Sequence, residues 1–365
     1  MKNTFGSNLT LTLFGESHGE SIGCVLDGLA PGLPVVPEQI AAQLERRRPG
    51  DSISTARVEP DQFRILSGVC HGRTTGTPLC ILIPNTQARS EDYAEIARRP
   101  RPGHADYAGY VKYHGFADPN GGGHFSGRMT AALVAGGAIL LDALRLKGIE
   151  LGTHIARLGG VADRRFDDCP ADLALLRERA FAALDPNSAS QMFAAALAAR
   201  EDGDSVGGVL ETAVIGLPAG LGEPWFDTLE GVLAHALFSI PGVKGVEFGD
   251  GFALCDRRGS EVNDPFRAVD GKIITTSNHN GGVNGGISNG MPLLFRCAVK
   301  PTPSISLPQE TVELPGMENV TLTLRGRHDP SIVPRACPVV DCLTALVLAD
   351  QLAGRCGTDW LASGR

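Results

Sequence analysis

The pattern of apolar and polar positions predicts alternating strands and helices. Leucine alternates with threonine over 9–14, and a second strand pattern covers 21–29. Residues 37–48 are typical of a helix, with proline at the start and three arginines in the last turn. Short strand patterns return over 63–83, and 126–147 has the clearest helical pattern in the chain.

Parts of this pattern occur twice. The segment SIGCVLDGLAPGLP at 21–34 aligns without gaps on SVGGVLETAVIGLP at 205–218. Further along, TGTPLCILI at 75–83 resembles NGMPLLFRC at 289–297. A repeat in the same order is the sequence signature of two related units. An internal duplication and a chance match both remain open at this point.

The elements favour an α+β fold, because neither half shows the regular strand–helix alternation of a doubly wound sheet or an eight-fold barrel. We expect one domain over residues 1–365, with related halves at about 9–150 and 200–350. Each half would contribute an antiparallel sheet, and the helices would pack between the two sheets.

Composition narrows the class of protein. The 365 residues carry a net charge of −8, which argues against a general nucleic-acid or anionic-membrane binder. The longest run without a polar side chain, 131–141, is too short to cross a bilayer, and no secretion signal is evident. Nine cysteines without a CxxC pair indicate reduced thiols. We expect a cytoplasmic protein, and the net charge still allows a local basic pocket to bind a small anion.

Two kinds of segment can supply that pocket. Gly121 to Gly123 let backbone N–H groups approach an anion at the start of the long helix, which Ser126 can cap. Arginines at 46–48 and 98–101 can bind phosphate or carboxylate oxygens through two N–H groups at once. The structural alternative for the glycine segment is a capped turn, and for the arginines at 46–48 it is a solvated helix end. No intact Walker or GxGxxG motif is present in the sequence.

Three histidines suit proton transfer. His18, His104 and His328 each lie beside an acid in a loop bounded by glycine or proline, and imidazole titrates near neutrality. The sequence has no HExxH motif or helix-spaced pair, so we predict no metal site. The glycine- and asparagine-rich run 277–290 is compatible with an anion nest and with a mobile loop.

Eight motifs follow one another along the chain: LFGESHG (13–19), RRRPG (46–50), RPGHADY (101–107), GGGHFSGR (121–128), GVKGVEFGDG (242–251), SNHNGGVNGGIS (277–288), VKPTPSI (299–305) and GRHDPSIVPRA (326–336). Taken in this order, they resemble the chorismate synthase family. Each motif is weak alone, but the ordered set is specific and spans nearly the whole chain. The resemblance implies a homotetramer with a β-α-β sandwich fold. It also implies that the protein is a lyase of aromatic amino acid biosynthesis. The implied reaction converts 5-enolpyruvylshikimate 3-phosphate to chorismate and phosphate by 1,4-anti elimination. It uses reduced FMN without net redox change.

The resemblance also implies roles for single residues. His18 and His104 match the catalytic histidines, near the departing phosphate and the flavin ring respectively. Asp329 matches the carboxylate that helps flavin N5 take the ring proton. Arg47 and its neighbour Arg48 match the substrate or NADPH region. The positions that match FMN-binding stretches are His124, Phe125, Ser126, Gly285, Lys300, Pro301, Thr302, Pro303, Ser304 and Arg327.

The sequence departs from the family pattern in two places. Many members have Arg-Ser-Ser where this chain has His-Phe-Ser at 124–126, and many have an arginine where this chain has Ile53. The second departure leaves open whether NADPH or a separate flavin reductase reduces the flavin.

Two other functions remain as alternatives. The first is a redox enzyme in which FMN passes a hydride to product, which would stop after one turnover per flavin. The second is a non-catalytic sensor of phosphorylated metabolites, whose affinity would survive Asp329→Asn.

Overall fold

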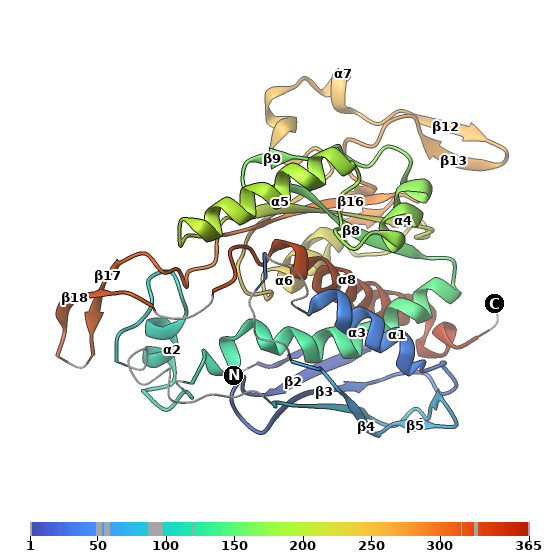
Figure 1. Ribbon diagram of the computed structural model, residues 1–365. Helices are drawn as coiled ribbons and strands as arrows, with labels where there is room; N and C mark the ends of the chain where they lie inside the picture. The colour runs from blue at the N-terminus through green and yellow to red at the C-terminus, as the bar shows by residue number, and fades with distance from the viewer. Residues whose placement is uncertain are drawn as a thin grey trace.

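The computed structural model describes residues 2–48, 53–54, 59–86, 98–118, 120–314, 316–324 and 328–363. Two five-stranded antiparallel sheets enclose a layer of helices (Figure 1). The first sheet has the order β1 (Thr4–Phe5), β2 (Thr10–Gly15), β3 (Ser21–Asp27), β7 (Leu79–Pro84), β4 (Arg64–Ser67). The second has the order β11 (Val243–Phe248), β16 (Leu293–Val299), β10 (Gly208–Ile215), β8 (Glu150–Leu158), β9 (Val161–Ala162).

Four helices fill the space between the sheets, and two others cover the opposite side of the second sheet (Figure 1). This arrangement confirms the predicted α+β class. Four two-stranded hairpins complete the described strands. The inner helices are α1 (Pro37–Arg47), α3 (Thr130–Leu146), α6 (Leu229–Leu237) and α8 (Val333–Cys356), and the outer ones are α4 (Cys169–Glu178) and α5 (Pro186–Glu201). The hairpins are β5–β6 (Val69–Cys70, Arg73–Thr74), β12–β13 (Phe266–Val269, Lys272–Thr275), β14–β15 (Val283–Asn284, Ile287–Ser288) and β17–β18 (Gln309–Glu313, Glu318–Leu322).

Four strands of each sheet have the same order and connectivity. The sheet order β2-β3-β7-β4 in the first half matches β8-β10-β16-β11 in the second, with α1 and α6 after the second strand and α3 and α8 closing the halves. The register differs, however. Leu26 pairs with Leu79, whereas Leu210, which aligns with Leu26, pairs with Cys297. Residues of both halves contribute to one hydrophobic core. The single domain and the internal duplication stay predictions.

The two longest inner helices are apolar because they are buried. Gly127–Leu146 and Val333–Cys356 have the length and composition of a membrane span, but 78% and 94% of their apolar windows lie inside the protein. They cross closely at Gly137, where an added Cβ would lie 2.5 Å from the Cβ of Cys342. Their hydrophobicity is therefore that of core helices packed between two sheets.

The long helix differs in one detail from its prediction over 126–147. Two 3₁₀ turns, η2 (Gly123–Phe125) and η3 (Gly127–Met129), precede the first residue of α3, Thr130. Ser126 caps η3 by accepting a hydrogen bond from the backbone N–H of Arg128 at 3.2 Å. The side chains of His124, Phe125 and Arg128 therefore project from tight turns, before the regular helix begins.

Candidate active site

A cavity of about 610 Å³ lies where the ends of several elements meet. Its walls come from the end of α1, the 103–105 loop, the η2–η3 turns, the 238–244 loop after α6, the 300–304 loop after β16 and the first turns of α8. Several distant motifs therefore converge on one space. The predicted site residues that line it are Arg47, His104, His124, Phe125, Ser126, Lys300, Pro301, Thr302, Pro303, Ser304 and Asp329.

The three arginines at the end of α1 point in different directions. Arg46 donates to Asp341 of α8 at 3.0 Å, and Arg48 donates to the carbonyl of Pro60 at 3.1 Å. Arg47 alone of the three lines the cavity. Successive side chains project about 100° apart on a helix, so one of three must face the site beside the helix end. Arg48 was also predicted to bind substrate or NADPH, and it does not line the cavity.

A buried carboxylate, Asp61, connects two arginines of the cavity wall. Arg47 Nη2 donates to Asp61 Oδ2 at 2.7 Å, and Arg128 Nη1 donates to Asp61 Oδ1. Burial favours the neutral form of Asp61, but the two arginines lower its pKa below the ordinary value. Burial, with Arg335 and Arg128 nearby, lowers the pKa of Arg47 to about 10 although Asp61 opposes the change. The three groups form one charged unit.

Arg335 orders a second part of the cavity. Its Nη1 donates to Asp329 Oδ2 at 2.8 Å, and its Nε donates to the carbonyl of Arg47 at 3.0 Å. It therefore connects the predicted catalytic carboxylate to the end of α1. Arg128 and Arg335 were not predicted as site residues, although both lie within the motifs that carry the family resemblance. Arg128 follows the predicted site residue Ser126 by two positions, and Arg335 follows Asp329 by six.

His104 lies among charged partners. Its Nδ1 is 2.5 Å from Asp106 Oδ1 and 3.0 Å from Arg101 Nη2. Arg101 in turn donates from Nε to Asp106 Oδ2 and from Nη2 to Asp106 Oδ1, both at 2.8 Å. Lys300 Nζ donates to the carbonyl of Gly103, which holds this loop from the cavity side. The arrangement fixes both the position and the orientation of the imidazole.

His18 lies behind the triple-glycine loop and does not line the cavity. The glycines at 121, 122 and 123 have φ values of 63°, 101° and 52°, in the left-handed region that side chains disfavour. A Cβ at Gly121 would lie 2.0 Å from the ring of His18, and a Cβ at Gly122 would lie 3.3 Å from His104. The loop therefore contacts both predicted catalytic histidines, and only glycine fits there. Ser17 Oγ is 2.9 Å from His18 Nδ1.

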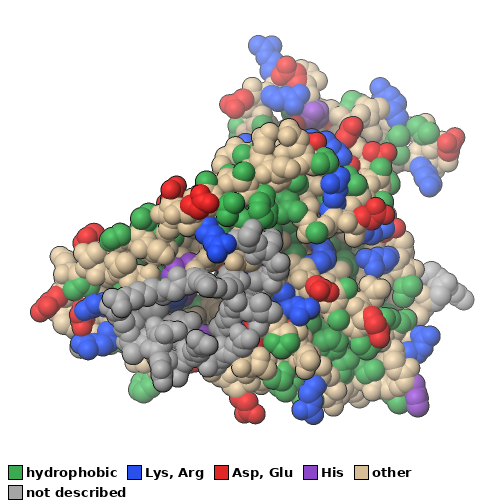
Figure 2. Space-filling model, in the orientation of Figure 1, with side chains coloured by type: hydrophobic (Ala, Val, Ile, Leu, Met, Phe, Trp, Pro, Cys, Tyr) green, Lys and Arg blue, Asp and Glu red, His purple; other side chains and the backbone are tan. Residues whose placement is uncertain are grey.

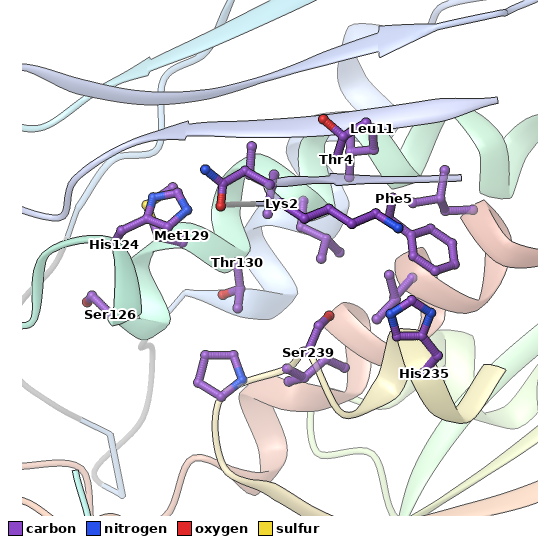
Figure 3. A pocket seen from close by; sticks show the side chains of 17 residues that line it. Lys2, Thr4, Phe5, Leu11, His124, Ser126, Met129, Thr130, His235 and Ser239 are labelled. Atoms are coloured by element: carbon purple, nitrogen blue, oxygen red, sulfur yellow. The ribbon is translucent and has the colours of Figure 1, made fainter. Parts of the chain in front are cut away.

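His124 lines the main cavity and also a smaller one beside it, and Figure 3 shows the smaller one. Its Nδ1 donates to the carbonyl of Gly15 at 2.8 Å, which leaves Nε2 to accept hydrogen bonds in the neutral ring. The smaller cavity, about 280 Å³, is mainly apolar and runs toward the ring pair of Phe5 and His235. The wall between the cavities includes Ser126 and Ser239.

Other predicted residues lie apart from the cavity or outside the described residues. Gly285 lies in the β14–β15 turn, so its FMN role stays a prediction, and Arg327 lies outside the described residues. Ile53 is 1% exposed and belongs to the core. His328 does not line the cavity, and burial, with Arg101 nearby, lowers its pKa. The cations of Arg98 and Arg99 pair with Glu313 at 2.7 and 3.0 Å.

The 277–290 run is organised by an internal carboxylate. Asp264 accepts hydrogen bonds from the Ser277 hydroxyl at 2.7 Å, from the His279 N–H at 2.8 Å and from the Asn280 N–H at 3.0 Å. The start of the run is thus a nest, as one interpretation of the sequence held. Its occupant is a side chain of the same protein and not a free anion.

Surface charge and cavity charge differ. Lys and Arg side chains are intermingled with Asp and Glu on the face drawn in Figure 2. The cavity, by contrast, is lined by five basic residues, Arg47, Arg128, Lys244, Lys300 and Arg335, and two acidic ones, Glu59 and Asp329. The excess of cations favours an anionic ligand inside the protein over a polyanion on this face.

Comparison with known proteins identifies the family. Residues 9–353 match the family model described as chorismate synthase. Chorismate synthases of Pyrococcus abyssi and Thermococcus kodakarensis are 48% and 47% identical, each over 96% of this chain and 97% of theirs. A chorismate synthase crystal structure aligns with a TM-score of 0.75 at 29% identity, over 97% of this chain and 94% of that one. The chain belongs to the chorismate synthase family.

Proposed function

We propose that the chain forms chorismate by a 1,4-anti elimination of phosphate from 5-enolpyruvylshikimate 3-phosphate, with reduced FMN as cofactor. Family membership makes it an enzyme, a chorismate-forming lyase of the shikimate pathway. The cofactor, the stereochemistry and the roles of single residues are the content of the proposal.

One observation carries the proposal: cations and proton-transfer groups share the same cavity. The substrate bears two carboxylates and a phosphate, and Arg47, Arg128 and Arg335 offer guanidinium groups that match such oxygens bidentately. His104 and Asp329 lie in the same walls. Cationic groups held in place before reaction stabilise the negative charge that develops on a departing phosphate.

The residues of the cavity fit a flavin mononucleotide. The Oγ1 of Thr302 is buried and has no hydrogen-bond partner among the described residues, and it stands in the wall between Lys300 and Ser304. A ligand oxygen or N–H group would satisfy it. Phe125, Val243 and the neighbouring aliphatic wall offer apolar contact to a ring system. When bound, reduced FMN supplies electron density that weakens the breaking C–O bond.

In this proposal, three residues of the chain take part in proton transfer. His18, held by Ser17 behind the glycine loop, serves the departing phosphate. Asp329, held by Arg335, accepts or relays the proton lost from the ring. His104 acts at the flavin side of the cavity. General acid–base groups of this kind contribute about 10²–10⁴-fold to rate.

The proposal extends to the reductant, the assembly and the location. Ile53 is apolar and buried and so supplies no cation to NADPH, and we propose that a separate reductase reduces the flavin. NADPH supporting turnover by itself would overturn this part. We also propose that the protein is cytoplasmic and forms a homotetramer. Light scattering of the purified chain tests the homotetramer.

Anaerobic turnover with dithionite-reduced FMN tests the proposed function. The proposal predicts chorismate absorbance and phosphate release many times per flavin. A hydride-transferring redox enzyme would stop after one turnover per flavin, and a sensor would bind substrate without forming chorismate. Either of these results would overturn the proposal.

A further inference from the structure

The neighbours of His104 determine which of its ring nitrogens faces the cavity. Asp106 and Arg101 both approach Nδ1. On the other side of the ring, Gly122 is the neighbour: a Cβ added there would lie 3.3 Å from Cε1 and 3.6 Å from Nε2. Because Nδ1 is enclosed by protein groups, Nε2 is the nitrogen left for a ligand.

The contact with Asp106 locates a proton. Burial alone would raise the pKa of Asp106, but hydrogen bonds from Arg101 and His104 lower it well below the usual range, so the carboxylate is ionised. Two atoms that each carried only lone pairs would repel at the 2.5 Å between Asp106 Oδ1 and His104 Nδ1. A hydrogen atom therefore lies between them, and it belongs to Nδ1.

Arg101 holds the carboxylate in place for this contact. Its backbone N–H donates to Asp106 Oδ2 at 2.9 Å, in addition to the two guanidinium hydrogen bonds. Nη2 donates to Asp106 Oδ1 at 2.8 Å and also lies 3.0 Å from His104 Nδ1, so Arg101 and Asp106 compete for this nitrogen. The contact of Nδ1 with the ionised Asp106 Oδ1 is the shorter one, at 2.5 Å, and it favours Nδ1 as a donor. Arg101 is 8% exposed, which limits its alternative positions.

We propose that Asp106 is a positioning residue that keeps His104 in the Nδ1–H tautomer and presents Nε2 to the cavity, with Arg101 fixing Asp106. The inference deepens the proposed function, since it rests on proton transfer by His104. It names Nε2 as the atom that takes up and releases the proton. A carboxylate that sets the tautomer of a catalytic histidine is a recurrent catalytic device.

The variant Asp106→Asn keeps the shape of the side chain and removes the carboxylate that sets the tautomer of His104. An amide has one acceptor oxygen where Arg101 requires two, and its NH₂ group can donate to Nδ1 and so favour the opposite tautomer. We expect kcat to fall on the order of 10²-fold or more while KM stays within about threefold, because substrate binding by the arginines is untouched.

Nitrogen-15 NMR of histidine-labelled protein reads the tautomer directly, with neither FMN nor substrate present. The wild-type chain should show His104 protonated on Nδ1, with the signal assigned by its loss in His104→Gln, and Asp106→Asn should shift the proton toward Nε2. Asp250→Asn is the matched control, since Asp250 Oδ2 lies 2.6 Å from Nδ1 of His279 in a separate pair. It should change the His279 signal alone.

Wild-type His104 protonated on Nε2 would overturn the inference, even if Asp106→Asn failed to fold. An unchanged tautomer in a folded Asp106→Asn would overturn it too. Since the NMR measurement needs no turnover, its result is independent of whether the proposed reaction is correct.

Discussion

Replacing Asp61 by asparagine tests the charged unit of the cavity wall. The carboxylate is fully buried, and the side chains of its partners Arg47 and Arg128 are 4% and 6% exposed. The substitution keeps the size of the side chain and removes the only charge that these arginines are shown to share. Two buried guanidinium groups would then face each other with less compensation, so the folded state should lose stability.

The size of the effect follows from burial. Removing one partner of a buried ion pair costs about 3–5 kcal/mol, since a charge remains in a poorly solvated site. At about 2.1 cal/mol/K of unfolding entropy per residue, that corresponds to a fall in Tm of roughly 4–7 °C for a chain of this length. Inorganic phosphate should raise the Tm of Asp61→Asn more than that of the wild type, because an anion in the cavity partly replaces the carboxylate.

Thermal unfolding with and without phosphate is the assay. The control is Asp142→Asn, which removes a partly exposed pair with Arg145 (3.0 Å) and should change the free energy of unfolding by less than about 1 kcal/mol. Equal stability of Asp61→Asn and Asp142→Asn would refute the reasoning. So would a phosphate response identical to that of the wild type.

Three further predictions have defined outcomes. His18→Ala and His104→Ala should each lower kcat by roughly 10²-fold or more with Tm retained, and near-wild-type rates in both would defeat their assignment. Burial disfavours charged His154, but hydrogen bonds to a neighbouring aspartate and to Glu211 (3.0 Å) raise its pKa. Its stabilisation is therefore complete below about pH 6.5 and is lost as pH rises through the folded pKa. Urea unfolding should show the gap between wild type and His154→Asn narrowing with rising pH, and a constant gap would contradict this. Gly137→Ala should destabilise the chain by about 1–3 kcal/mol despite better helix propensity, because the methyl group meets the backbone of α8; a stabilised variant would contradict the close crossing.

Much of the fold could be predicted from hydrophobic periodicity. Alternation over 9–14 and 21–29 gave β2 (Thr10–Gly15) and β3 (Ser21–Asp27) to within two residues at each end. The Gly-x-Pro-Leu repeat leads into β7 and β16, which take the same place in the strand orders of the two sheets. The register of the two sheets could not be predicted from the sequence, since it depends on side-chain packing between strands and not on either strand alone.

The site was predictable as a set of motifs but not as a network. His104 and Lys300 were expected near one another, and the Lys300–Gly103 hydrogen bond joins their loops. Asp61 had no sequence signal, because its partners lie 14 and 67 residues away in the chain. The nest at 277–280 has the composition of an anion site, and only the fold supplies Asp264 as its occupant.

A crystal structure of the chain with FMN and 5-enolpyruvylshikimate 3-phosphate tests the central claim most directly. The account predicts the flavin between His104 and the 300–304 loop, with the substrate anions on Arg47, Arg128 and Arg335 and the reacting ring within reach of Asp329. Electron density for either ligand outside this cavity, with the 300–304 loop free of both, would contradict it.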